Sequence, residues 1–289
     1  MSLFKRDLVL IDADFYAHKA YAVHKEFNVN GRGTGIQFGM INTLARIVRD
    51  HSTCDLHVCW GDRRSNLWRS KKFPGYKAHR TEHEADFGLQ VTDTHNIISS
   101  LGMKQWLLPT WEADDVISHL ARKSVDERDG MVYIYSNDHD MLQLASGTIR
   151  IIRERSKGRS EEFGREEVIL KYGVPPEDLP RLFSYIGERG DGIPGIPGIG
   201  PKRAAEILRG ERPVPGNSMV EKLRTVKIVG EHIQLIKLMY DVPLKDNILF
   251  ADRDLDYITQ MAATLRFGDR WRSNASKISA FTQAAEIMV

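Results

Sequence analysis

The chain has 289 residues, of which 42% are hydrophobic and 28% charged, a balance typical of a soluble globular protein with a sizeable core. Its formal net charge of +2 is too small to indicate a partner, so that evidence must come from local charge. No apolar run reaches the length of a membrane span or of a secretory signal. Cys54 and Cys59 lie too far apart along one extended segment to bridge, so we expect reduced thiols and a cytoplasmic protein.

In chain order, apolar strands alternate with helical patterns over the first 165 residues. Strands are predicted at 8–12, 55–61, 104–109, 131–136 and 148–154, and helices at 35–51, 84–101 and 112–124. This alternation predicts right-handed βαβ units and an α/β fold with a doubly wound parallel sheet. Beyond residue 165 short helical segments take over, so we expect a first α/β region at 1–165 and a mainly helical second region at 166–289.

Carboxylates stand at or just after the ends of the predicted strands. They are Asp12 and Asp14, then Asp62, then Glu112, Asp114 and Asp115, then Asp138 and Asp140. One such acid most often caps a helix, and acids at a helix start are stabilised by its dipole. Their repetition after four parallel strands, however, would place all of them along one edge of the sheet. Oxygen ligands without His or Cys indicate Mg²⁺ or Mn²⁺ rather than zinc, and two such ions are a recurring arrangement for phosphodiester hydrolysis.

A basic segment at 63–80 separates the second predicted strand from the next helix. It carries seven Lys or Arg and no Asp or Glu, with Trp68, Phe73 and Tyr76 interleaved. A solvated surface loop would explain the charge alone. The segment is longer than the usual connection in such folds, and cations with aromatic rings suit a surface that follows phosphates and stacks on bases. We therefore expect single-stranded nucleic acid to be drawn toward the carboxylates.

A glycine-rich turn precedes a basic helix at 187–208. Gly195, Gly198 and Gly200 allow close backbone approach, and Pro201 suits the first position of a helix. The free amides at that helix start, together with Lys202 and Arg203, would form an anion site. The glycine spacing matches neither a P-loop nor a dinucleotide fingerprint. The turn and the helix are typical of a phosphate clamp for duplex DNA.

The order of these motifs resembles the 5′-nuclease family of flap endonucleases, phage 5′–3′ exonucleases and the 5′-nuclease domain of bacterial DNA polymerase I. The matching pieces are LIDAD, WGD, FPGYKAHR, WEADD, SNDHDMLQL and IGERGDGIPGIPGIGPKRAAEIL, which run from residue 8 to about 208 in family order. The resemblance implies a PIN-like α/β nuclease domain with a helical arch at about 63–95. It also implies a helix-3-turn-helix region that binds duplex DNA.

The resemblance also assigns residues. It implies a first metal site of Asp12, Asp62, Glu112 and Asp114, and a second of Asp138, Asp140 and Asp191, with Asp115 and Glu188 as nearby or outer acids. Lys77 and Arg80 match a basic pair that neutralises the scissile phosphate, and Tyr76 matches an aromatic that stacks on the terminal base. The turn at 195–200 matches a region that holds K⁺ on backbone carbonyls, here those of Ile196 and Ile199.

Three positions depart from the family pattern. Glu188 stands where Asp is usual, Gly192 replaces a common Asn, and His139 replaces a frequent Lys or Gly. No core carboxylate is missing, so the resemblance implies an active two-metal 5′–3′ exonuclease and flap endonuclease that acts in DNA replication and repair. The implied substrate is DNA with a 5′ flap or a 5′ end at a junction, or an RNA–DNA hybrid. The length leaves no room for a polymerase, which implies a free-standing, monomeric enzyme.

Three other functions remain open on the residues alone. A phosphatase of the haloacid-dehalogenase type also has Asp-x-Asp after its first strand, but it leaves the basic segment and the glycine turn unexplained. A non-catalytic binder of DNA structures would not need the full set of acids. A PIN-type ribonuclease would share the acids, although the duplex clamp favours DNA or a hybrid.

Overall fold

A seven-stranded sheet forms the centre of the molecule, for which a computed structural model describes residues 6–79, 85–127, 130–155, 159–244, 248–249 and 253–287. The strand order is β8-β7-β6-β1-β4-β5-β9. The five inner strands are parallel: β1 (Leu8–Asp12), β4 (Asp55–Trp60), β5 (Lys104–Leu107), β6 (Val132–Tyr135) and β7 (Ile149–Glu154). Two antiparallel strands, β8 (Ser160–Phe163) and β9 (Ile248–Leu249), complete the edges. The predicted doubly wound α/β sheet is confirmed.

Both faces of β1 are buried, as its unbroken apolar sequence predicts. Leu8 and Leu10 belong to one core cluster, and Val9 and Ile11 to another on the opposite face. This division follows from the two-residue repeat of a strand, which sends alternate side chains to opposite faces. The sheet is therefore the wall between two separate hydrophobic cores.

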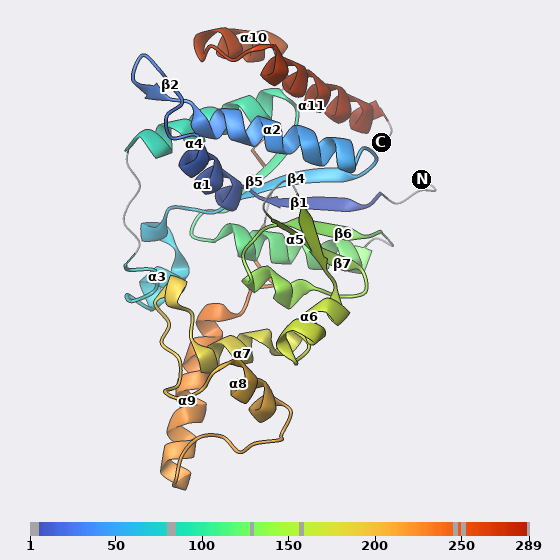
Figure 1. Cartoon of the computed structure of the whole chain (residues 1–289). Helices are drawn as coiled ribbons and strands as arrows, with labels where there is room; N and C mark the ends of the chain where they lie inside the picture. The colour runs from blue at the N-terminus through green and yellow to red at the C-terminus, as the bar shows by residue number, and fades with distance from the viewer. Residues whose placement is uncertain are drawn as a thin grey trace.

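Helices cover both faces of the sheet (Figure 1). On one face lie α1 (Ala13–Val23), α2 (Gly35–Asp50) and α4 (Ala85–Ser100), with α10 (Leu255–Thr264) and α11 (Asp269–Ile287) packed outside them. On the other face lies α5 (Ala113–Glu127), whose Val116, Ile117 and Leu120 contact the Leu8 and Leu10 side. A short hairpin of β2 (Asn28–Val29) and β3 (Arg32–Gly33) links α1 to α2. Among the described residues, no helix is both long and apolar enough to cross a membrane.

The helical region does not form one packing unit. Helices α6 (Arg165–Tyr172), α7 (Leu179–Ile186), α8 (Pro201–Leu208) and α9 (Met219–Ile236) lie beyond α5 and extend its core (Figure 1). Helices α10 and α11 instead return to the sheet, where Trp271 is 1% exposed and its Nε1 donates to the carbonyl of Gln37 at 3.3 Å. The helices after residue 165 therefore pack on two different surfaces, which the sequence did not predict because an amphipathic pattern does not say which surface a helix covers.

Candidate metal centre and nucleic-acid interface

The carboxylates of β1 and β6 meet where the chain reverses its order across the sheet. From β1 the chain proceeds to β4 and β5 on one side, and then to β6 and β7 on the other. Asp12 ends β1, and Asp138 and Asp140 follow β6, its neighbour. Asp12 accepts hydrogen bonds from the Ser136 hydroxyl at 2.6 Å and from the Phe15 amide at 3.0 Å, so it also caps α1. Such a reversal is where open α/β sheets bind ligands.

Three of these acids are buried, and their pKa values are raised. Burial raises the pKa of Asp12 to about 6; the Ser136 hydrogen bond opposes this rise, and the negative charge of Asp138 adds to it. Burial raises the pKa of Asp14 to about 8, together with the charge on Asp12. Burial, Asp138 and Asp12 raise the pKa of Asp114 well above its usual value. A divalent cation relieves this like-charge crowding, so the donor set fits the hard ion that the family implies.

Asp14 is one of the strand-end carboxylates, but the family resemblance places it in neither metal site. Its Oδ2 accepts a hydrogen bond from the Gly61 amide at 3.0 Å, which ties the end of β4 to the start of α1. A Cβ on Gly61 would lie 2.6 Å from that oxygen, so only glycine permits the contact. The signal was available in the Asp-x-Asp spacing, but the spacing alone does not reveal the partner.

Glu112 is the acid whose charge the protein itself neutralises. Its carboxylate accepts from Lys77 Nζ at 2.5 Å, from Arg69 at 2.7 Å and from the Tyr76 hydroxyl at 3.1 Å. Burial would raise the pKa of Glu112, but Lys77 and Arg69 lower it to about 2. Glu112 therefore stays ionised in the middle of the cluster and holds the basic segment down on it.

Arg69 is a site residue that the sequence analysis counted only as part of the basic segment. It lies in α3 (Trp68–Lys72), is 2% exposed, and makes two hydrogen bonds to Asp115, at 2.5 and 2.8 Å. Asp115 is fully buried and also accepts from the Met239 amide at 2.9 Å. Arg69 Nε donates to the carbonyl of Leu235 at the end of α9. The ion pair between Arg69 and Asp115 joins α3, α5 and α9. The carboxylate of Asp115 is therefore engaged by Arg69 and helps to hold these helices together.

Tyr76 and Lys77 are folded onto the cluster. Tyr76 is 5% exposed and bonded to Glu112, which differs from the expected ring that stacks on a base. Lys77 has a φ of +51°, and its amide donates to the Asp191 carbonyl at 2.9 Å while its Nζ lies 3.8 Å from that carboxylate. Such a left-handed conformation is unusual for a lysine and needs surrounding contacts to hold it. Arg80, its expected companion, lies outside the described residues.

The side chain of Asp62 is hydrogen-bonded to the loops that surround it. Its carboxylate accepts from the amides of Thr110 and Arg63, both at 2.7 Å, and from Asn66 at 3.1 Å. Burial would raise the pKa of Asp62, but these hydrogen bonds, that of Thr110 first, lower it. Asp62 thereby joins the end of β4 to the loop that carries Glu112.

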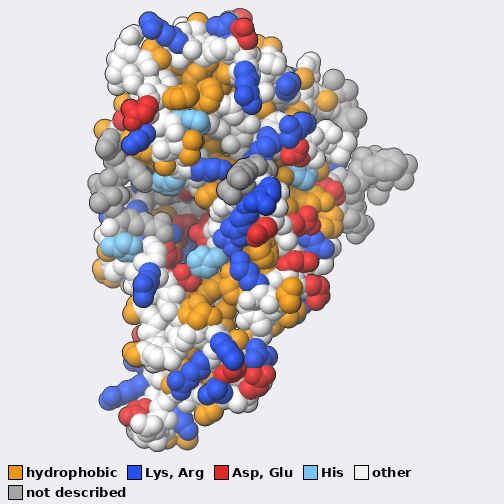
Figure 2. All heavy atoms as spheres, viewed as in Figure 1, with side chains coloured by type: hydrophobic (Ala, Val, Ile, Leu, Met, Phe, Trp, Pro, Cys, Tyr) orange, Lys and Arg blue, Asp and Glu red, His pale blue; other side chains and the backbone are white. Residues whose placement is uncertain are grey.

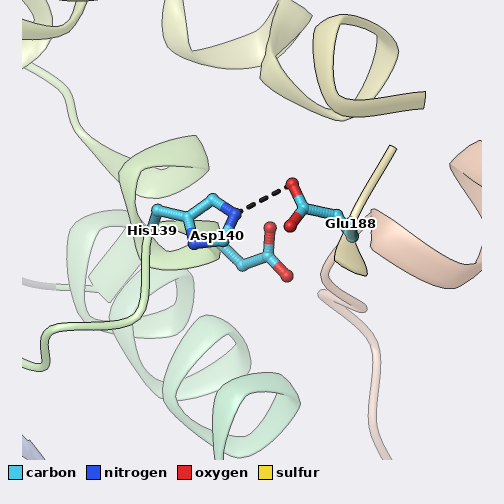
Figure 3. A group of neighbouring side chains, drawn as sticks. All are labelled: His139, Asp140 and Glu188. Carbon is cyan, nitrogen blue, oxygen red and sulfur yellow. Dashed lines mark hydrogen bonds and ion pairs between the residues drawn. The ribbon is translucent and has the colours of Figure 1, made fainter. Parts of the chain in front are cut away.

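A second group lies between β6 and the segment after α7. The ring of His139 and the carboxylate of Asp140 both point toward Glu188 (Figure 3), and the ligand atoms of the three lie within 4.8 Å of one another. Burial would lower the pKa of His139, but its hydrogen bond to Glu188 and the charges of Asp140 and Glu188 raise it to about 9. Burial and Asp138 raise the pKa of Asp140 well above its usual value.

Gly192 closes the turn that presents Asp191. It ends the 3₁₀ turn at Arg189–Asp191 with a φ of +76°, a left-handed conformation that Gly adopts freely and Asn tolerates. The departure from Asn therefore preserves the turn. A Cβ there would lie 2.8 Å from the Gly75 carbonyl oxygen, so the close approach of the two backbones also favours glycine at this position.

The glycine turn before α8 presents cations to solvent. Lys202 and Arg203 are exposed at the helix start, after Gly200 as the N-cap. Gly198 has a φ of +76°, and a Cβ on Gly195 would lie 2.3 Å from the Ile186 carbonyl.

Figure 2 shows acidic side chains inside a hollow on this face, with Lys and Arg side chains gathered beside it. Basic surface next to recessed acid is suited to guiding a polyanion to a metal centre.

The metal-free protein should lose stability as the pH rises. The pKa of Asp14 rises from 3.8 to about 8 on folding, and that of His139 from 6.5 to about 9. Each raised pKa contributes stability that is present below the unfolded value and lost as pH rises through the folded one. In EDTA, we expect the Tm to fall between pH 5 and pH 9, and Asp14→Asn to flatten the part below pH 8. A Tm that rose over this range would contradict the shifts.

Recessed strand-end acids beneath a lysine are an arrangement suited to holding metal ions for phosphodiester hydrolysis. A family model described as "5′-3′ exonuclease, N-terminal resolvase-like domain" matches residues 7–173, and the chain belongs to this family. DNA polymerase I of Mycobacterium leprae is 31% identical over 281 residues, which is 90% of this chain and 30% of the polymerase. The 5′-3′ exonuclease of Aquifex aeolicus is 30% identical over 205 residues, 71% of this chain and 69% of the relative.

Solved structures share the fold. Flap endonuclease-1 from Methanococcus jannaschii has a TM-score of 0.67 at 18% identity, over 97% of this chain and 94% of its own. The T5 5′-exonuclease with bound zinc has a TM-score of 0.63 at 18% identity, over 96% of this chain and all of its own. The family model and the sequence relatives confirm the resemblance to the 5′-nuclease family.

Proposed function

We propose that this chain is a structure-specific 5′ nuclease that cleaves DNA phosphodiesters at a 5′ flap or at a 5′ end beside a duplex. The observation that carries the proposal is the crowding of buried carboxylates where β1 meets β6, under Lys77. The chain spans about 30% of the polymerases it matches, so substrate and activity are inferred from its own residues. Replication or repair is the setting we propose, in the cytoplasm, where its two buried cysteines would stay reduced.

Two groups of acids would hold two divalent ions, Mg²⁺ or Mn²⁺. The first is Asp12, Asp62, Glu112 and Asp114, and the second is Asp138, Asp140, Glu188 and Asp191. When bound, the ions would lower the pKa of an attacking water and neutralise charge on the leaving oxygen. Ser136 orients Asp12, and the Asp138 carboxylate accepts from the Asp140 amide at 2.8 Å, so the chain itself fixes both groups.

Lys77 would position and neutralise the scissile phosphate. Its ammonium group lies between Glu112 and Asp191, one from each group of acids. It is thus the cation placed to accompany a phosphate that enters between them. Arg80 would assist from the arch at about 63–95.

Duplex DNA would rest on the turn at 195–203. Exposed Lys202 and Arg203 and the amides after Gly198 would bind phosphates, and backbone carbonyls of Ile196 and Ile199 would hold K⁺. We propose this part as the helix-3-turn-helix element, and RNA–DNA hybrid as a further substrate. The enzyme would act as a monomer.

Product mapping tests the proposed function. A 5′-flap duplex labelled at the flap end should yield labelled oligonucleotides and a 5′-phosphate on the duplex product, with Mg²⁺ and not with EDTA. Turnover of small phosphomonoesters without flap cleavage would indicate the phosphatase instead. Binding without Mg²⁺-dependent cleavage would indicate a structural DNA binder.

Lys77→Ala should lower the cleavage rate of the flap substrate by about a hundredfold, because charge stabilisation in a recessed site contributes a few kcal/mol to the transition state. Single-turnover rates with saturating enzyme measure this directly. Lys171→Ala, which removes a cation that lies on the rings of Phe163 and Tyr172 instead, is the matched control. Equal effects of the two changes would remove the role given to Lys77.

A further inference from the structure

Two of the three departures from the family pattern contact each other. The Nε2 atom of His139 lies 2.8 Å from the Glu188 carboxylate, and a shorter Asp side chain at 188 would reach less far toward the ring. A nitrogen donor therefore stands in the second group of acids, in a position that the strand-end pattern alone had assigned to oxygen. The absence of histidine was the reason to favour a hard cation, and His139 removes that reason at this group.

The three donors are spaced for one ion. Their ligand atoms lie within 4.8 Å of one another, whereas donors bonded at about 2.1 Å to one tetrahedral ion lie about 3.4 Å apart. Closing the set therefore takes a shift of at most about 1.4 Å in its widest pair. Asp140 and Glu188 supply oxygen, and the His139 ring and the Asp140 carboxylate both point toward Glu188 (Figure 3).

The ring of His139 is held in place by its surroundings. Its edge contact with Phe183 has a centroid separation of 4.8 Å and an interplanar angle of 87°. Its Nδ1 atom lies 3.6 Å from the Asp138 carboxylate. A carboxylate hydrogen-bonded to the second ring nitrogen commonly orients a metal-binding histidine, and Asp138 lies near that position without making the bond. The site thus has a ligand set and a ring that Phe183 holds in place.

We propose that His139, Asp140 and Glu188 form a mixed nitrogen–oxygen site that prefers a borderline transition-metal ion, such as Zn²⁺ or Co²⁺, and that this ion takes the place of the Mg²⁺ or Mn²⁺ assigned above to the second group of acids. Imidazole suits these ions, whereas Mg²⁺ takes oxygen ligands almost exclusively. The inference rests on the proposed function only for the role of this ion in cleavage. The ligand set itself would exist without DNA.

Selective ¹⁵N labelling of the 10 histidines tests the site in the metal-free full chain, without DNA. Long-range ¹H–¹⁵N spectra report each imidazole nitrogen. On titration with Zn²⁺, the Nε2 signal of His139, identified by its loss in His139→Gln, should shift at the lowest concentrations. Mg²⁺ should leave it nearly unchanged. His79→Gln, a histidine exposed on the basic segment, is the matched control and should leave the shift intact.

Calorimetry on the same samples measures affinity. His139→Gln should weaken Zn²⁺ and Co²⁺ binding by about tenfold or more and leave Mg²⁺ binding within about twofold, and the retained Mg²⁺ binding shows that the variant is folded. A Zn²⁺ titration that leaves Nε2 unmoved would overturn the proposal. Tighter Zn²⁺ binding by His139→Gln than by the native protein would also overturn the proposal. It would mean that His139 is a cation that competes with the metal ion for Asp140 and Glu188. Because no DNA is present, failure here leaves the proposed function standing, and failure to cleave a flap leaves these signals unaffected.

Discussion

Asp138→Ala should abolish measurable flap cleavage, with a fall of about a thousandfold, while DNA affinity changes by less than about threefold. Asp138 belongs to the second group of acids, and its charge raises the pKa values of Asp12 and Asp114 in the first group and of Asp140 in its own. Its own side chain is 38% exposed, so an ion can reach it from solvent. Loss of one metal ligand removes several kcal/mol of transition-state stabilisation, which corresponds to this fall in rate.

Two further variants test whether the loss of cleavage is specific to the charge of Asp138. Asp138→Asn keeps an oxygen for the Asp140 amide and removes the charge, so it should be as inactive as Asp138→Ala if charge matters. Asp126→Ala removes an exposed acid on α5 and should cleave normally. Rates in Mg²⁺ and binding in Ca²⁺, measured on one flap duplex, complete the comparison. Cleavage by Asp138→Ala at the native rate would show that the metal centre lies elsewhere.

Arg69→Met should lower the stability of the whole fold by about 3–5 kcal/mol, because it leaves Asp115 and part of Glu112 buried without their cation. In a chain of this size that loss corresponds to a fall in Tm of roughly 5–8 °C. Differential scanning calorimetry in EDTA measures it without any contribution from bound metal.

The exposed pair Arg165–Glu177 provides the control. It has the same two-bond geometry, at 2.7 and 2.8 Å, on the surface of the helical region. Exposed pairs contribute little, so Arg165→Met should leave the Tm nearly unchanged. Similar losses in the two variants would mean that Arg69 acts as an ordinary surface cation.

The strands were predictable because both their faces are buried, which gives unbroken apolar runs such as LVLID. Helix α1 was not, because only four of its eleven residues are buried, and its residues include His18 and Lys19. Strand β8, SEEF, has one buried residue at an antiparallel edge and leaves no apolar pattern. An apolar pattern in the sequence reflects which residues are buried. Helices and strands with few buried residues therefore cannot be predicted from such a pattern.

The site was predictable in its acids, since strand ends of a parallel sheet share one edge. Its cations were not. Arg69 and Lys77 have the same sequence surroundings as the exposed Lys71 and Lys72, and only the folding of the segment onto Glu112 separates them. The contact between His139 and Glu188 joins residues 49 positions apart, which no local pattern can report.

The return of α11 to the sheet affects the order in which the molecule can fold. Trp271 and Asn274 reach Gln37 and Asn42 across 234 and 232 residues. Closing a chain segment of that length costs about 5 kcal/mol of entropy before the contact contributes anything. As the chain leaves the ribosome, the outer surface of α2 therefore stays open to solvent until α11 has been made. Metal-binding acids assembled early would sit in a domain that becomes rigid only near the end of synthesis.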